Sequence, residues 1–359
     1  MYILAFESSC DETSASVVLA EDGVLTIKSN IIASQVDTHR LYGGVVPEIA
    51  SRAHIEAISR ITYEALEEAG LSLRDISLIA VTDHPGLIGA LLVGVNFAKS
   101  LAFSHNIPLV AVDHIKGHIA TSFLKVSEDC EVPKPPFISL VVSGGHTSIY
   151  KSLSYTETEI IGQTRDDAIG EAFDKIGRLI GIPYPAGKGF DALSDEGFCR
   201  VSQNKEEAFS LFGASPLRHK KEWKLPSPAL SGDSPDFSFS GLKTAACNLL
   251  HKYEQNGEEI DKALFAAAYT YEAVEGVSKQ IEKTLDENPD CDLVVAGGVS
   301  ANSHLRRRLT QLCKKMGRKI YIPPVSLCGD NAAMIAAAGY YEFLEGRLAS
   351  ADLNASAYD

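Results

Sequence analysis

Two segments of the chain share one layout, in which an apolar stretch, a short polar turn and a second apolar stretch follow each other directly. The first occupies residues 2–19, with its polar turn at 7–13, and the second occupies residues 137–153, with its polar turn at 143–147. Short apolar runs joined by a polar turn are typical of paired strands. Because α/β structure follows each pair, the recurrence predicts a duplicated α/β fold.

Further strands and helices are predicted in both halves. Apolar runs of strand length lie at 76–81, 109–112, 293–296 and 319–322. Helical periodicity with start and stop signals predicts helices at 47–69, after Pro85-Gly86 through residue 101, and at 163–180, 240–254, 258–286, 302–316 and 330–344. A proline-rich break lies at 127–136, and the polar, proline-interrupted residues 196–235 are predicted to be a surface excursion. Two such hairpins, one in each half, are the layout of the actin-like ATPase architecture.

Charge and cysteine usage limit the partners and the compartment. The formal net charge is −14, so any binding of nucleic acid needs a local basic patch or a partner protein. The seven cysteines include no CxxC pair, which indicates a reducing cytosol. The first apolar run is too short for a signal peptide, and no run of about 18 apolar residues lacks polar interruption. We therefore expect a cytoplasmic protein with no membrane role.

His114 and His118 stand four residues apart at the predicted start of a helix. Side chains at this spacing lie on one helical face, where two neutral imidazoles can share a divalent metal ion. Two unrelated histidines would give the same spacing. A zinc protease of this type needs glutamate after the first histidine as its general base, and Ile115 occupies that position.

A metal bound by this pair needs a further ligand. The candidates are Asp330 at the start of the last helix, Asp11 and Glu12 in the first polar turn, and His146 in the second. An aspartate at a helix start is more often a plain N-cap, so the sequence leaves both roles of Asp330 open.

Three glycine-bearing turns follow predicted strands, at 143–145, 297–298 and 85–86. Glycine lets the backbone approach a ligand, and successive N–H groups can hold an anion. Neither a P-loop nor a dinucleotide-binding GxGxxG motif is present. The acids at 170–175 lie on the polar side of a predicted helix, where internal ion pairs on a solvated face are the more frequent case. Lys243, in the segment 236–244, is available for an anion, but ordinary capping by Ser240 would explain the same segment.

The chain resembles the bacterial branch of the TsaD family, the tRNA N6-adenosine threonylcarbamoyltransferases. The resemblance runs in order through ESSCDET at 7–13, GGVVPE at 43–48, PGLIG at 85–89, HIKGH at 114–118, VSGGHT at 142–147, GEAFDK at 170–175, FSFSGLKT at 237–244, GGVSAN at 297–302 and Asp330-Asn331. It implies an α/β actin-like ATPase (ASKHA, ribonuclease H-like) fold of two lobes with a central cleft. The expected lobes are residues 1–113, completed by a C-terminal helix at 330–346, and residues 114–329 with the excursion at 196–235.

The resemblance also implies the site residues. One divalent metal ion per subunit, Fe²⁺ or Zn²⁺, would be held by His114, His118 and Asp330. The implied substrate contacts are Val141, Val142, Ser143, Gly144, Gly145, Asp174, Gly187, Asp191 and Asn302. Contacts to phosphate or nucleotide, with ATP, ADP or AMP as the occupant, are implied at Ser9, Glu12, Gly297 and Gly298.

The activity implied is transfer of the threonylcarbamoyl group from threonylcarbamoyl-AMP to the N6 amine of adenosine 37 in tRNAs that read codons beginning with A. The implied partners are tRNA, a TsaB-like paralogue and a TsaE-like ATPase, with no DNA. Basic residues at 306–308, 314–315, 318–319 and 218–224 are candidate tRNA contacts, or a solvated surface. A metal-dependent endopeptidase and a non-catalytic nucleotide-binding scaffold are the alternatives.

The chain departs from the family pattern in two turns. His84 replaces the first glycine of a Gly-Pro-Gly turn, and Ala186 and Lys188 replace glycine and proline in a Pro-Gly-Gly-Pro run. We expect both changes to alter the shape of their turns, the second beside the implied contact at Gly187.

Overall fold

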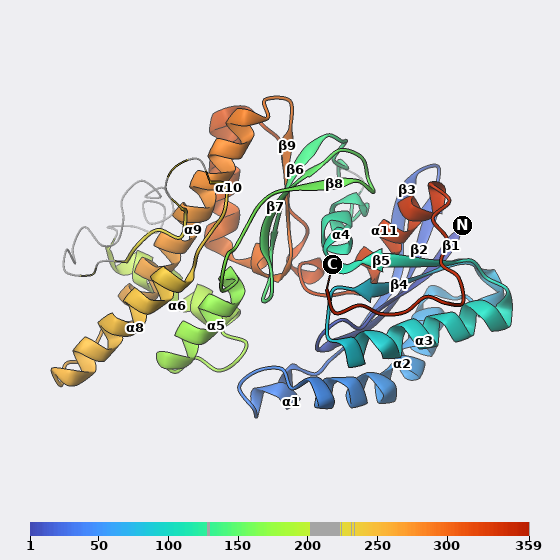
Figure 1. The fold of residues 1–359 in the computed structure, drawn as a ribbon, viewed down its shortest axis with the longest axis horizontal. Coiled ribbons are helices and arrows are strands. Elements are labelled where there is room, and N and C mark those ends of the chain that lie inside the picture. Colours follow the sequence, from blue (N-terminus) through green and yellow to red (C-terminus); the bar gives the residue numbers. More distant parts are fainter. Residues whose placement is uncertain (128–129, 202–222, 224, 231, 233, 359) are drawn as a thin grey trace. The chain divides into compact units, whose positions relative to one another are not determined.

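The computed structural model describes residues 1–127, 130–201, 223, 225–230, 232 and 234–358. The chain divides into two compact units (Figure 1). Unit 1 comprises Met1–Pro135, Ser152–Glu157 and Pro323–Asp359, and unit 2 comprises Pro136–Lys151 and Thr158–Ile322.

Unit 1 is built on a five-stranded sheet. Its strands are β1 (Tyr2–Glu7), β2 (Glu12–Glu21), β3 (Val24–Ser34), β4 (Ile76–His84) and β5 (Leu109–Asp113), in the spatial order β3-β2-β1-β4-β5. β1 pairs antiparallel with β2 and parallel with β4, so the hairpin lies on one side of the central strand and the crossover strands on the other.

Helices cover both faces of this sheet (Figure 1). Helices α2 (Pro47–Ala69) and α3 (Ile88–His105) pack on the face that carries Leu4, Phe6 and Val81. Helix α11 (Ala332–Leu344) packs on the opposite face, where a Cβ on Gly339 would lie 2.6 Å from the Cβ of Ala80. Side chains alternate along a strand, so neighbours such as Ala80 and Val81 serve different faces. The short helices α1 (Val36–Arg40), α4 (His114–Ala120), η1 (Leu73–Asp75), η2 (Thr121–Phe123) and η5 (Val325–Leu327) complete the unit.

Unit 2 repeats the strand order of unit 1. Its strands are β6 (Phe137–Val142), β7 (Thr147–Ser152), β8 (Thr158–Gln163), β9 (Asp292–Ala296) and β10 (Ile320–Tyr321), in the order β8-β7-β6-β9-β10. As in unit 1, a meander of three consecutive strands runs from the central strand, β6, to the edge strand, β8, and β9 and β10 extend the sheet in parallel on the other side of β6. The duplication predicted from the two hairpins is therefore confirmed in topology.

The helices of unit 2 enclose an aromatic and aliphatic core that includes Phe173, Phe190, Phe265 and Tyr269. They are α5 (Ile169–Leu179), α6 (Gly187–Val201), α8 (Ser240–Gln255), α9 (Lys262–Glu287), η4 (Gly298–Ala301) and α10 (Ser303–Met316). Tyr269 is the largest of the fully buried side chains and contacts the rings of Phe173, Phe190 and Phe265.

The structure differs from the sequence predictions in several elements. The third strand of each meander, β3 and β8, was not predicted, because these edge strands carry mixed polar and half-exposed residues without clean alternation. Helix α5 begins at Ile169 and not at 163, since residues 158–163 belong to β8.

The lobe boundaries and the excursion also differ. Residues 114–135 and 323–329, assigned from the sequence to the second lobe, belong to unit 1, because α4 packs on α11. Of the excursion expected at 196–235, residues 196–201 continue helix α6. Trp223 is 2% exposed, and the rings of Tyr253 and Phe265 contact it, so it is a core residue and not a surface one. The basic run 218–221 lies outside the described residues.

Among the described residues, one helix, α3, is long and apolar enough to cross a membrane by length and composition. A third of its apolar window is buried inside the protein, and the helix packs against α2 and β4.

Candidate metal centre

The histidine pair lies on helix α4, which begins directly after β5. Asp113, the last residue of that strand, caps the helix: its Oδ1 accepts hydrogen bonds from the N–H groups of Ile115 at 2.6 Å and Lys116 at 3.2 Å. The cap starts the helix at His114 and thereby places His118 one turn later. The two imidazole rings lie 4.6 Å apart between centroids, and both side chains are buried.

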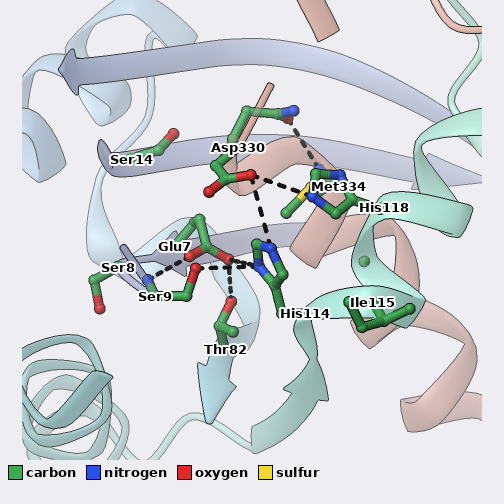
Figure 2. A network of polar contacts seen from close by, with 12 residues as sticks. Glu7, Ser8, Ser9, Ser14, Thr82, His114, Ile115, His118, Asp330 and Met334 are labelled. Atoms are coloured by element: carbon green, nitrogen blue, oxygen red, sulfur yellow. Dashed lines mark hydrogen bonds and ion pairs between the residues drawn. The ribbon is translucent and has the colours of Figure 1, made fainter. Parts of the chain in front are cut away.

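Asp330 reaches this pair from the other end of the chain (Figure 2). Its Oδ1 lies 3.2 Å from Nε2 of His118 and 3.7 Å from Nε2 of His114. One ligand atom from each of the three residues lies within 4.8 Å of the others. Of the four residues considered as a further ligand, the structure brings Asp330 to the histidines; within the described residues, Asp11, Glu12 and His146 belong to no such group.

The capping role considered for Asp330 falls to its neighbour. Asn331 is the N-cap of α11, and its Oδ1 accepts from the N–H of Met334 at 3.1 Å. The carboxylate of Asp330 is thus available to the histidines.

The donor set fits a divalent metal ion. Two imidazoles and one carboxylate are ligands that zinc and iron sites use. Within the part of the chain that the structure describes, neither ring nitrogen of the buried His118 makes a hydrogen bond of good geometry, although Nε2 is close to the Asp330 oxygen. A buried imidazole without hydrogen bonds is costly, and a coordinated ion would satisfy it.

Three polar residues lie on the other side of His114: Glu7 at the end of β1, Ser9 in the turn after it, and Thr82 on β4, which acts through Glu7 (Figure 2). Nδ1 of His114 lies 3.2 Å from Oε2 of Glu7 and 3.2 Å from Oγ of Ser9. Thr82 on β4 donates its hydroxyl hydrogen to the same Oε2 at 2.5 Å. Glu7 and Thr82 were not among the residues predicted from the sequence.

The electrostatics of the group follow from burial and the close charges. Burial alone would lower the pKa of His114, but the charges of Asp330 and Glu7 raise it to about 9. Burial acts to raise the pKa of Glu7, yet the neighbouring His114 holds it below its ordinary value. Burial and the charges of Asp330 and Asp11 raise the pKa of Glu12 to about 9. Several carboxyl groups are thus gathered where a cation would be stabilised.

In unit 2, glycines let three segments meet at the end of β6. The half-buried Ser143 begins the turn, and Gly144 and Gly145 are exposed, with no atom within 4 Å of the position of an added Cβ. A Cβ on Gly170, in the first turn of α5, would lie 2.5 Å from the carbonyl oxygen of Ser143. Gly297, with φ +89°, approaches the carbonyl oxygen of Val142 as closely. The turn therefore lies against the N-terminus of a helix, where N–H groups favour anions.

The polar residues that the family resemblance implies as substrate contacts all have hydrogen-bond partners within unit 2. Oδ1 of Asp174 accepts from the N–H of Ala186 at 2.7 Å, which ties α5 to the segment that contains Gly187. Asp191 accepts from the N–H and the hydroxyl of Ser303. Asn302 caps α10, and its Oδ1 accepts from the N–H of Leu305 at 2.9 Å. Val141 and Val142 are buried at the end of β6.

The two departures from the family pattern are accommodated. His84 is the last residue of β4 and does not have a positive φ, so its position needs no glycine. The methyl group of Ala186 is buried against Gly177, where an added Cβ would lie 2.4 Å away. Lys188 lies in the first turn of α6 and is exposed.

The missed supporting residues carried weak local signals. Glu7 follows an apolar strand, and Asp113 precedes the helix as an N-cap would. Thr82 has no signal of its own, because its role depends on the pairing of β1 with β4.

Curated relatives match nearly the full length of the chain. A model of the TsaD family, described as tRNA N6-adenosine threonylcarbamoyltransferase, matches residues 26–337. The enzyme of that name from Clostridium botulinum (strain Hall) is 49% identical over 354 residues, which cover 98% of this chain and 96% of the relative. That from Clostridium perfringens (strain SM101) is 46% identical over 353 residues, with the same coverage.

Solved structures support the fold. Full-length HypF in its phosphate- and nucleotide-bound form matches 100% of this chain with a TM-score of 0.57 at 16% identity, and HypF from T. kodakarensis matches 98% with the same score at 14% identity. The match spans about half of those longer chains, at 47% and 49%. The α/β, actin-like ATPase fold is confirmed. With close to half of its residues identical to curated members over almost its whole length, this chain belongs to the TsaD family of tRNA N6-adenosine threonylcarbamoyltransferases.

Proposed function

We propose that this chain transfers the threonylcarbamoyl group from threonylcarbamoyl-AMP to the N6 amine of adenosine 37 in tRNAs that read codons beginning with A. Family membership establishes the coarser statement, that the chain is a transferase that modifies tRNA. In the proposed step the N6 nitrogen forms a bond to the carbamoyl carbon, the bond from that carbon to the phosphate oxygen breaks, AMP leaves, and the amine loses a proton. The donor is a reactive mixed anhydride, so the protein has to position it and stabilise charge without a nucleophilic side chain.

The single observation that carries the proposal is the convergence of His114, His118 and Asp330 from distant parts of the sequence. We propose that these residues hold one divalent metal ion, Fe²⁺ or Zn²⁺. When bound, such an ion supplies Lewis-acid stabilisation of negative charge. The chain's own contribution is a rigid ligand set, since the ligands lie on α4 and beside α11, which pack on each other.

The proposed contacts in unit 2 follow the glycine-bearing segments. The turn at 143–145 offers exposed backbone beside the start of α5, which suits an anionic group. The segment Gly297-Gly298 and Asn302 would receive the nucleoside part. Because Oδ1 of Asn302 accepts from Leu305, its amide nitrogen is the group left to donate to a ligand. Asp174 and Asp191 would shape the substrate site by holding Ala186, next to Gly187, and Ser303.

In unit 1, Ser9 and Glu12 would contribute contacts to phosphate or nucleotide, as the resemblance implies, with ATP, ADP or AMP as further occupants. The two compact units would be the two lobes of the actin-like fold. A cytoplasmic location and work together with a TsaB-like paralogue and a TsaE-like ATPase belong to the same proposal.

Three of the basic residues of α10 give little support as tRNA contacts. Arg308 binds Glu275, Arg307 binds Asp195, and Lys315 binds Glu282. Their charges are thus largely matched within unit 2, and tRNA capture would rest on other surfaces or on the partner proteins.

Reconstitution tests the proposal directly. The purified chain, its partners and an enzyme that makes threonylcarbamoyl-AMP are incubated with tRNA, labelled threonine, bicarbonate and ATP, and label on adenosine 37 is measured. We expect label only with the chain present, none on a transcript with guanosine at position 37, and none with His114→Ala. If adenosine 37 is labelled equally without the chain, the transferase proposal is wrong and the non-catalytic nucleotide-binding scaffold remains as the alternative. The endopeptidase alternative is disfavoured, because Ile115 stands where the base would be and is buried.

A further inference from the structure

Glu7 lies behind the metal-binding face of His114, in direct contact with the ring nitrogen that faces away from Asp330 (Figure 2). We propose that Glu7 is a positioning residue of the metal centre: its carboxylate accepts the Nδ1 hydrogen of His114 and so turns the Nε2 lone pair toward the metal ion. This inference rests on the proposed metal centre. It adds a residue that acts through a ligand and not on the substrate.

The hydrogen-bond pattern assigns the tautomer. An ionised carboxylate only accepts, and its Oε1 takes the N–H of Ser9 at 2.5 Å while its Oε2 takes the hydroxyl of Thr82 at 2.5 Å. The contact of 3.2 Å from Oε2 to Nδ1 of His114 therefore requires the hydrogen on Nδ1. In the neutral ring, the lone pair is then on Nε2, which lies 3.7 Å from Oδ1 of Asp330.

The sheet places Glu7 rigidly. Glu7 ends the central strand β1 of the unit 1 sheet, and its side chain is fully buried. Phe6 pairs with Val81 in the parallel register of β1 and β4, so the next residues lie side by side: Glu7 at the end of β1, and Thr82 two residues before the end of β4. A ligand set held by such outer partners is already oriented before the ion binds.

His118 lacks the same support. Its Nδ1 is buried with no hydrogen-bond partner among the described residues, so none of them provides an acceptor on the far side of the ring that would select a tautomer. Glu7 thus acts on one of the two histidines, and the effect of its replacement has to be read at His114.

Glutamine at position 7 is a sharp probe, because it keeps the shape and changes the acceptors. Three donors, from Ser9, Thr82 and His114, converge on the two carboxylate oxygens. An amide has one oxygen, so either the Ser9 contact or the pair of contacts from Thr82 and His114 meets an N–H₂ group, whichever way the amide is turned.

The test is titration of the chelator-treated full chain with Co²⁺ and Zn²⁺. For Glu7→Gln we expect the metal affinity to fall about ten- to a hundredfold and the visible absorption of bound Co²⁺ to change, as for other outer partners of ligating histidines. Thr82→Val, which removes one contact to Oε2, is expected to give a smaller loss in the same direction. The Co²⁺ spectrum reports ligand geometry, which a purely structural role would leave unaltered.

Thr13→Val is the matched control. Like Thr82, Thr13 is a buried threonine of the unit 1 sheet whose hydroxyl makes a hydrogen bond, here with Nδ1 of His54 at 2.8 Å, but His54 belongs to no candidate metal group among the described residues. The metal affinity and the Co²⁺ spectrum of Thr13→Val are expected to equal those of the wild-type chain.

The outcomes separate the two proposals. A wild-type chain that binds neither ion refutes the metal centre itself. A wild-type chain that binds, together with unchanged affinity and spectrum in Glu7→Gln, refutes only the positioning role. If Glu7→Gln does not fold, Thr82→Val decides, and wild-type affinity and spectrum in that variant overturn the inference.

Discussion

Gly117 of α4 and Ile335 of α11 are in such close contact that a Cβ on Gly117 would lie 2.7 Å from Cδ1 of Ile335. Gly117 stands between the two histidines, and Ile335 follows Asp330 by little more than one helical turn. The missing side chain at 117 therefore lets α11 approach α4, and this approach brings the carboxylate of Asp330 to both imidazoles.

This contact predicts a measurable coupling. Gly117→Ala should crowd Ile335 and weaken metal binding, while Ile335→Val, which removes Cδ1, should relieve the crowding. Alanine also raises helix propensity by about 1 kcal/mol, so the single variants alone are hard to interpret. In a double-mutant cycle of unfolding free energies we expect a favourable coupling of about 0.5 kcal/mol or more. Simple additivity would show that the approach of the helices does not depend on the glycine.

Metal should stabilise unit 1 through Asp330. An ion that binds only the folded chain stabilises it by about 2.7 kcal/mol at a hundredfold excess over its dissociation constant. We expect Zn²⁺ to raise the melting temperature of the wild-type chain, and Asp330→Asn to lose most of this rise. Glu64→Gln makes the same change of charge at a half-exposed residue of α2, paired with Arg60, and should keep this rise. If Zn²⁺ raises the melting temperature of Asp330→Asn as much as that of the wild type, Asp330 is not a metal ligand.

The start of helix α8 should be sensitive to acid through Asp166. Burial acts to raise the pKa of Asp166, but hydrogen bonds from the hydroxyls of Ser238 and Ser240 and from two backbone N–H groups hold it below its ordinary value. A carboxyl group whose pKa is lowered by folding stabilises the folded state at pH values above its unfolded pKa of about 3.9. This stabilisation is lost as the pH falls through the pKa of the folded state.

Asp166→Asn should therefore destabilise the chain by about 1 kcal/mol at neutral pH, as loss of a capping group does. The difference from the wild type should shrink below about pH 4, where the wild-type carboxylate is also protonated. Urea unfolding between pH 3 and 7 measures this difference in the free energy of unfolding. Asp286→Asn, at the exposed end of α9, is the control. A difference that does not vary with pH would contradict the ionised cap.

Trp223 should report the folding of unit 2. It is the only tryptophan in the chain, it is 2% exposed, and its Nε1 donates to the hydroxyl of Tyr253 at 3.0 Å. We expect blue-shifted emission that moves to the red on unfolding. Tyr253→Phe should cost about 1 kcal/mol, because it removes the hydroxyl that accepts the hydrogen bond from the indole N–H. Strong acrylamide quenching of the native chain would place Trp223 at the surface instead.

Local patterns in the sequence were enough for most elements. The apolar strands β1, β6 and β9, and long helices such as α2 and α10, carry strong periodicity and clear caps or stops. The edge strands β3 and β8 carry polar and half-exposed residues on both faces, so their residues show no clean alternation, and no pattern predicted them.

In the candidate metal site, too, one part follows from local sequence and another part depends on tertiary packing. The spacing of His114 and His118 determines that both imidazoles share a helical face, because α-helical geometry is local. Whether Asp330 serves as a cap or as a ligand depends on its neighbour Asn331, which takes the capping role. Neither choice can be made without the packing of α11.

By itself, the sequence determined the duplicated α/β pattern, the paired histidines and the family of this chain. Only the tertiary structure decided that Asp330 meets those histidines, that Glu7 and Thr82 support one of them, and that Trp223 is a core residue. The reason is physical: helix and strand periodicity act over neighbouring residues, whereas ligand distances and burial depend on how distant segments pack.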